Sequence, residues 1–230
     1  MIVNLENITS YFFKTPIYSF ENKEYLNELN KISDNYILQA KKNSINILNE
    51  REKNWSNKIY NQKKDHGLTY HFTLPKNEKK IKKFKDFILK VSNLILDNQG
   101  FELKNHSLHF SELWVQEFSK LGGGNHNSHI HNNCHISGFY FLKCSDKTSY
   151  PVFHDPRPAA LISKLPEKNP KNISLANELI HFYPTPGTFV FFNSYLPHEF
   201  TVDNGIEDFR FVHFNIQAIN NSILSNNLTK

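Results

Sequence analysis

The sequence has little cysteine and no apolar segment long enough to cross a membrane. Its 230 residues include two cysteines, Cys134 and Cys144, so a disulfide framework cannot hold the fold together and a hydrophobic core must do so. No apolar run approaches the roughly 20 residues that a transmembrane helix needs. The N-terminus also lacks the basic, apolar and small-residue segments of a secretory signal. We therefore expect a cytoplasmic protein with two free thiols.

Basic residues outnumber acidic residues by only a small margin, and many of the basic residues lie in one segment. The formal net charge is +5, and many lysines lie in NEKKIKKFKDFILKV. Ile81, Phe84, Ile88 and Val91 recur there at helical spacing while the lysines take the opposite side, which predicts an amphipathic helix with a solvated face. This interpretation accounts for the lysines without a nucleic-acid or membrane partner.

The chain changes character near its hundredth residue. Residues 1–100 are predicted to be mainly helical, with a first long helix from Lys23 to about Ile47. After them come short segments rich in aromatic and β-branched residues, which predict strands: LHFSELWVQEF, HISGFYFLK, PVFHD, LIHFYP, GTFVFFNS and FRFVHFNI. Several are apolar on both faces, as in a sheet covered by a second sheet and by helices. We predict one domain over residues 1–230, with a helical flank (1–100), a β core (101–218) and a tail (219–230).

Histidines gather at one point of the β core. Of twelve histidines in the chain, four fall within GGGNHNSHIHNNCHISGFYFL. If this segment is extended, His129 and His131 point to the same face and can meet one metal ion, while Ile130 turns into the core. His126 and His135 fall out of that register. The pair predicts metal ligands, and the alternative is a pair of surface or hydrogen-bonded histidines.

Two later residues extend this pattern. In PGTFVFFNSYLPHEF, a turn and a buried strand lead to His198, a candidate third ligand. Arg210 opens the next strand, whose apolar neighbours make a guanidinium costly to bury unless an anion is bound there. The alternative is that Arg210 pairs with an acidic residue of the preceding loop: Asp203, Glu207 or Asp208.

Taken in order, these motifs resemble the 2-oxoglutarate and iron(II)-dependent dioxygenase superfamily, specifically its prolyl-hydroxylase-like branch in bacteria and phages. The segments that carry the resemblance are FFKTPIY, SHIHNNCHISGFYFL, VFHDPRP, PGTFVFFNSYLPHEF and FRFVHFN. The resemblance implies a mainly β, double-stranded β-helix (jelly roll, cupin-like) core with N-terminal helices packed on one sheet. It also implies Fe(II), 2-oxoglutarate and O₂, with hydroxylation of a substrate that the sequence does not identify.

The resemblance further implies roles for individual residues. His129 and His198 would bind the iron, Arg210 would form a salt bridge with the distal carboxylate of 2-oxoglutarate, and Tyr140 would hydrogen-bond the same carboxylate. The position two after the arginine, a serine or threonine in many relatives, is Val212 here.

The metal site departs from the usual pattern of these enzymes. Most complete the ligand set with Asp or Glu at the position that His131 occupies here. Three neutral imidazoles suit iron(II) but also zinc, and Asp155 is an alternative third ligand unless it pairs with Arg157. Two other functions therefore stay open: a three-histidine metal dioxygenase or hydrolase without 2-oxoglutarate, and a non-catalytic cupin-like binding module. The sequence does not indicate the oligomeric state.

Overall fold

The structure is a computed structural model that describes residues 13–55, 65–75, 77–157 and 165–223. The helices in these ranges are η2 (Lys23–Tyr25), α1 (Leu26–Asn43), α2 (Ile45–Trp55) and α3 (Lys82–Asn98). The strands are β1 (Ile17–Glu21), β2 (Thr69–Thr73), β3 (His106–Phe118), β4 (His126–His129), β5 (Ile136–Lys143), β6 (Pro151–His154), β7 (Leu179–His181), β8 (Thr188–Asn193), β9 (His198–Phe200) and β10 (Arg210–Asn220). None of the described helices is both long and apolar enough to span a membrane.

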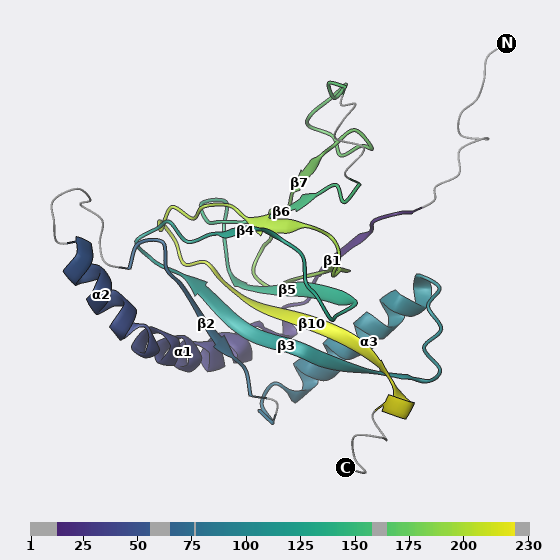
Figure 1. Cartoon of the computed structure of the whole chain (residues 1–230), viewed down its shortest axis with the longest axis horizontal. Coiled ribbons are helices and arrows are strands. Elements are labelled where there is room, and N and C mark those ends of the chain that lie inside the picture. Colours follow the sequence, from purple (N-terminus) through teal and green to yellow (C-terminus); the bar gives the residue numbers. More distant parts are fainter. Residues whose placement is uncertain (1–12, 56–64, 76, 158–164, 224–230) are drawn as a thin grey trace.

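The strands form two antiparallel sheets that face each other. The larger sheet has the order β1-β8-β5-β10-β3-β2, and the smaller has the order β4-β9-β6-β7. In Figure 1 the helices α1 and α3 lie on one side of the larger sheet, and β4, β6 and β7 lie on the other. The predicted jelly-roll core with helices packed on one sheet is confirmed.

Each face of the larger sheet has its own hydrophobic core. On the helix side, Phe84 of α3 packs with Tyr140 and Val212. On the side of the smaller sheet, the core contains Phe139 and Phe211. Successive residues of a strand point to opposite faces, so β5 and β10 contribute to both cores. This explains why both strands carry apolar residues on each of their faces.

The N-terminal hundred residues also contribute two strands that the sequence analysis did not predict. β1 and β2 form the two edges of the larger sheet. The predicted first helix is divided at Ser44, whose hydroxyl donates a hydrogen bond to the carbonyl of Ala40, and α2 begins at the next residue. At the other end, the predicted tail begins inside β10, and residues 224–230 lie outside the described residues.

Both cysteines are free thiols. Cys144 is in the inter-sheet region, and its burial raises the pKa of the thiol to about 12. A thiol with so high a pKa is present almost entirely as the unreactive protonated form at neutral pH. Cys144 is therefore not a nucleophile in this fold.

Candidate metal centre

Strand pairing brings the first and third predicted ligands together. His129 at the end of β4 lies directly opposite His198 at the start of β9. Directly paired residues of antiparallel strands hold their side chains close on the same face of the sheet. His198 does not continue the preceding buried strand, as the sequence had suggested, but begins a separate strand of the smaller sheet.

The second predicted ligand follows β4 on the same face. The backbone N–H of His131 donates a hydrogen bond to the carbonyl of Ser194 at 3.0 Å, which fixes the chain just after the strand. His129 and His131 point the same way, as the spacing predicted. Ile130 does not turn into the core: its side chain is 49% exposed. The smaller sheet has solvent on this side, so the intervening residue faces outward.

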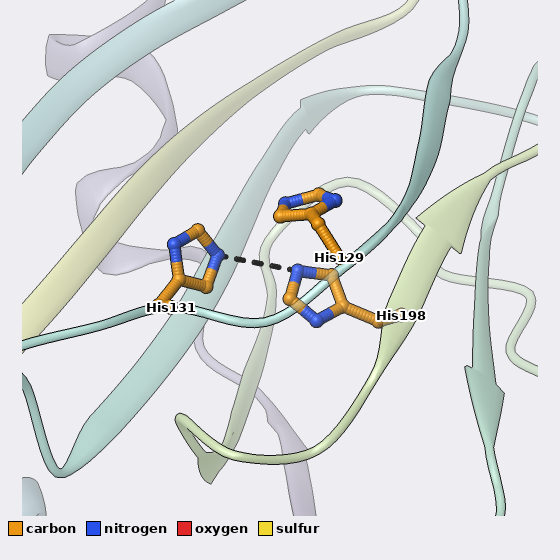
Figure 2. Close-up of side chains that lie close together, drawn as sticks. All are labelled: His129, His131 and His198. Carbon is orange, nitrogen blue, oxygen red and sulfur yellow. Dashed lines mark hydrogen bonds between the residues drawn. The ribbon is translucent and has the colours of Figure 1, made fainter.

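The three imidazoles converge on one point. One ring nitrogen from each of His129, His131 and His198 lies within 4.8 Å of the other two, and no other group of this kind occurs among the described residues. Figure 2 shows the rings turned toward one another, with His131 Nε2 and His198 Nε2 3.3 Å apart. Two nitrogens bound to one tetrahedral ion at about 2.0–2.1 Å lie roughly 3.3 Å apart. The separation therefore fits a shared metal ion.

The second nitrogen of each ring has a fixed neighbour. His129 Nδ1 lies 2.7 Å from the carbonyl of Asn127, and His198 Nδ1 lies 3.0 Å from the carbonyl of Leu196. Because carbonyls accept hydrogen bonds, both rings carry their proton on Nδ1 and keep the Nε2 lone pair for a metal.

His131 is oriented by a side chain instead of a carbonyl. Its Nδ1 lies 3.1 Å from the amide nitrogen Nδ2 of Asn215 on β10. The same amide group accepts a hydrogen bond from Ser137 at 2.6 Å and donates one to Glu112. Asn215 is 1% exposed, so this network holds the amide, and through it the ring of His131, in place.

Burial keeps two of the predicted ligands, His131 and His198, neutral. Burial, together with the neighbouring histidines, lowers the pKa of His198 to about 3 and that of His131 to about 4. At neutral pH these rings are therefore uncharged, which is the form that binds metals.

Arg210 lies away from this centre. It is at the start of β10 on the helix side of the larger sheet, where its Nε donates to Glu117 at 2.8 Å and its NH1 to Asp34 of α1 at 2.6 Å. Lys41 of α1 also contacts Glu117, at 2.6 Å. The guanidinium does have carboxylate partners, but they belong to the protein, and none is one of the three loop residues considered above. Arg210 therefore does not meet a ligand at the histidines in this structure.

Tyr140 also points away from the histidines. Its hydroxyl donates a hydrogen bond to the carbonyl of Asn22 at 2.8 Å, and its ring packs against Phe84 of α3. Tyr140 and Arg210 share the reason for this placement: each lies on the strand face that packs against the helices. Sequence alone did not reveal which face that was, because both faces of β5 and β10 are apolar.

The remaining candidates are also accounted for. Asp155 binds Arg157 through two hydrogen bonds of 2.9 and 2.6 Å, so the turn interpretation of Asp-Pro-Arg is confirmed. His135 Nδ1 accepts a hydrogen bond from the backbone of Ala218, and His126 contacts Gln116. Neither histidine displaces a member of the three-histidine cluster.

Sequence reasoning missed two residues beside the cluster, His213 and Asn215. Both lie on the inner face of β10, and His213 Nε2 is 3.2 Å from His131 Nε2. His213 and Asn215 are two residues apart in FRFVHFNI, and this spacing puts both side chains on one face of a strand. That spacing was the feature of the sequence that could have indicated them. Of this strand, the sequence predicts only Arg210 as a ligand-binding residue.

The comparisons with known proteins agree with this geometry. Residues 112–215, which include all three histidines, match the family model described as putative 2OG-Fe(II) oxygenase. The predicted resemblance to 2-oxoglutarate and iron(II)-dependent oxygenases is confirmed. No curated protein sequence matches the chain.

Similar chains also occur among solved structures. A prolyl-4-hydroxylase from Pseudomonas putida is 11% identical, with a TM-score of 0.51 over 87% of this chain and 92% of its own. A viral collagen prolyl hydroxylase from Paramecium bursaria Chlorella virus-1, solved with 2OG, is 10% identical, with a TM-score of 0.48 over 87% of this chain and 96% of its own. At 11% identity, the likeness to the Pseudomonas putida protein concerns the fold and not the substrate.

The donor set fits the metal of this oxygenase family. Three neutral imidazoles, two of them oriented by carbonyls and one by a buried amide, form a ligand set suited to a divalent first-row ion. The family match and the three-histidine cluster together support Fe(II) and 2-oxoglutarate as the cofactors.

Proposed function

We propose that this chain is an oxygenase that couples oxidation of 2-oxoglutarate to hydroxylation of a substrate C–H bond. In the overall reaction, 2-oxoglutarate, O₂ and the substrate yield succinate, CO₂ and the hydroxylated product, with one oxygen atom in succinate and one in the product. The observation that carries the proposal is the convergence of His129, His131 and His198 within 4.8 Å, inside the segment that matches the oxygenase family.

The protein's own residues would hold and orient the ion. The iron would supply the redox chemistry when bound. His129 and His198 would present Nε2 because backbone carbonyls hold their Nδ1 protons, and Asn215 would keep His131 in line with them. His198 is completely buried, so water has limited access from its side of the centre.

A cavity beside the centre offers room for a substrate. Its volume is about 970 Å³, and Trp114, Gln116 and His126 form its wall nearest the histidines. The ring of His126 lies 6.0 Å from that of His129. At its other end the cavity reaches Lys82 and Lys85 of α3. A cleft of this size accommodates a small molecule or one side chain of a larger substrate.

A second candidate function is favoured by one observation. Because Arg210 is paired with Glu117 and Asp34, the predicted anchor for the distal carboxylate of 2-oxoglutarate is already occupied. A three-histidine dioxygenase or hydrolase that does not use 2-oxoglutarate would not need that anchor.

Anaerobic reconstitution distinguishes these functions. Purified protein is loaded with Fe(II), titrated with 2-oxoglutarate while the visible charge-transfer band is followed, and then exposed to O₂ while succinate is measured. We expect a band and succinate formation, both lost in His198→Ala and retained in the matched control His135→Ala. Iron binding without a band or succinate would contradict the use of 2-oxoglutarate and favour the second function. Stabilisation by zinc or iron without turnover of any kind would indicate a binding module.

We also propose that residues 1–230 act as a single domain in the cytoplasm. The helices and both edge strands of the larger sheet come from residues before 100, so the β core is completed by the N-terminal flank. Two free thiols fit a reducing compartment.

A further inference from the structure

His213 is a fourth histidine beside the three predicted ligands. It lies on the inner face of β10, is 2% exposed, and places Nε2 3.2 Å from His131 Nε2. Its ring stacks on that of Trp114, with centroids 4.0 Å apart and an interplanar angle of 17°. Trp114 in turn lines the cavity. His213 therefore contacts both a predicted metal ligand and a residue that lines the cavity.

The hydrogen bonds of His213 are incomplete. Its Nδ1 is buried and has no partner, so Nε2 is the ring nitrogen that has a polar neighbour. That neighbour is His131 Nε2, the nitrogen that His131 would use for a metal. Once its lone pair is given to a metal, His131 Nε2 can no longer accept a hydrogen bond. A buried N–H without an acceptor costs free energy, so His213 needs another acceptor in the loaded protein.

His213 is not itself part of the converging ligand set. The group whose nitrogens all lie within 4.8 Å of one another comprises His129, His131 and His198, and among the described residues it does not extend to His213. His213 thus lies close enough to touch a molecule bound next to His131, but outside the set that holds the ion. Such a position suits a hydrogen-bond donor toward an incoming anion.

We propose that His213 donates a hydrogen bond from Nε2 to the carboxylate of a 2-oxo acid bound at the metal centre beside His131. The inference rests on the proposed function, because it requires a metal site at the three histidines. It assigns to His213 the ligand contact on β10 that the sequence had suggested for Arg210. A neutral imidazole can make this contact since one nitrogen carries a proton, and the burial of the ring keeps water from competing.

The test uses the protein loaded anaerobically with Co(II), whose visible spectrum reports ligand binding without turnover. Wild type is titrated with 2-oxoglutarate and, separately, with azide. His213→Phe keeps a flat ring on Trp114 but has no donor, His213→Met removes the donor with a more flexible side chain, and His213→Gln keeps an N–H. The matched control is His106→Phe, because His106 also has a buried Nδ1 without a partner but lies at the far end of β3.

We expect His213→Phe and His213→Met to bind Co(II) like wild type but to bind 2-oxoglutarate roughly 10- to 100-fold more weakly, as befits one lost hydrogen bond to a charged group. His213→Gln should recover part of the loss, and His106→Phe should show none. Unchanged anion affinity in the donor-free variants would overturn the inference. So would loss of Co(II) binding in them, because His213 would then be a ligand.

The outcome also separates this inference from the proposed function. If wild type binds no Co(II), both are overturned. If wild type binds Co(II) and azide but not 2-oxoglutarate, the cosubstrate assignment fails, and with it the carboxylate that His213 is proposed to contact. In that case weaker azide binding in His213→Phe would still show that the residue donates to anions, whereas equal azide binding would remove that role as well.

Discussion

Individual histidines of this chain differ in what their second ring nitrogen contacts, and this difference decides which can bind a metal. Those of His129 and His198 face backbone carbonyls, whereas that of His131 faces the side chain of Asn215. A carbonyl can only accept, but an amide can either accept or donate. Asn215 turns its amide nitrogen, a donor, toward His131 Nδ1. His131 therefore accepts at Nδ1 and carries its proton on Nε2 in the metal-free structure, and Nε2 must give up this proton before it binds an ion.

Removal of a ligand should abolish tight metal binding. We expect His198→Ala to weaken Co(II) binding by more than about 100-fold, since even loss of a residue that only orients a ligand costs 10- to 100-fold. Competitive titration with a metal indicator measures this. Asp155→Ala should bind as wild type does, because Asp155 is paired with Arg157. Weaker Co(II) binding in Asp155→Ala would indicate that the carboxylate of Asp155 is a metal ligand.

Acid should destabilise the metal-free protein through its buried histidines. Burial lowers the pKa of His126 and His131 to about 4 and that of His198 to about 3, whereas an unfolded histidine titrates near 6.5. Between these values the unfolded chain binds protons that the folded chain does not, so stability falls as the pH decreases from about 6.5 toward 4. Thermal unfolding of chelator-treated protein over this range should show a falling Tm. His126→Phe should show a shallower decrease, and an identical slope would argue against this cause.

Among the structural elements, β10 contributes most to both halves of the fold. Its helix-side face carries Arg210, which is bonded to Glu117 of β3 and Asp34 of α1, and its inner face carries His213 and Asn215. Successive residues of β10 point to alternate faces of the sheet. The segment FRFVHFNI does not show which face packs against the helices, because each face carries enough apolar residues to be part of a core. Sequence analysis therefore located the strand but did not reveal that Arg210 lies on its helix-side face.

Arg210→Ala should destabilise the fold without changing metal binding. Removing the guanidinium leaves Glu117, which is 1% exposed, with Lys41 as its remaining ion-pair partner, and breaking a buried pair costs about 3 kcal/mol or more. Urea unfolding measures the loss. The matched control is Arg157→Ala, whose exposed pair with Asp155 should contribute less than about 1 kcal/mol. A normal stability together with a raised requirement for 2-oxoglutarate would instead support the carboxylate contact predicted from the sequence.

Gly138 of β5 is required by close packing between neighbouring strands. A Cβ at this position would collide with the carbonyl oxygen of Val190 on β8 and with the ring of Phe214 on β10. We expect Gly138→Ala to lower the free energy of unfolding by about 3 kcal/mol. Gly100→Ala is the control: its φ is +90° but no atom lies within 4 Å of the added Cβ, so backbone strain of about 1–2 kcal/mol is the expected cost. Equal losses in the two variants would contradict the packing argument.

At the scale of the whole molecule, the sequence predicted the overall architecture better than it predicted the two edge strands of the larger sheet. The strands of the β core were recognisable because aromatic and β-branched segments alternate with turn residues. β1 and β2 were missed because five residues with mixed polarity give a weak local signal, and their pairing with β8 and β3 depends on distant parts of the chain. The histidine cluster could be predicted because its signals are also local. Two of the predicted ligands are close together in the sequence, and the third was suggested by the motif at the end of a strand.

Metal removal should lower the stability of the entire domain. His131 and His198 are 67 residues apart in sequence, so an ion that binds both binds the folded chain and not the unfolded one. At a free metal concentration 100 times Kd, this stabilises the fold by about 2.7 kcal/mol, or roughly 5–10 °C in Tm for a chain of this size. Differential scanning calorimetry with and without chelator measures the shift. His198→Ala should show none, and a chelator effect that persists in this variant would mean that the metal binds elsewhere.

The place of β10 in the larger sheet has a consequence for synthesis of the protein. It is the last described strand along the chain, yet it lies in the middle of the sheet between β5 and β3. While the ribosome has not yet released residues 210–220, β3 and β5 each have an unpaired, apolar edge of the kind that attracts other chains. A nascent chain is therefore exposed to aggregation until β10 has been made, and we expect a version truncated before Arg210 to be retained by chaperones or to precipitate.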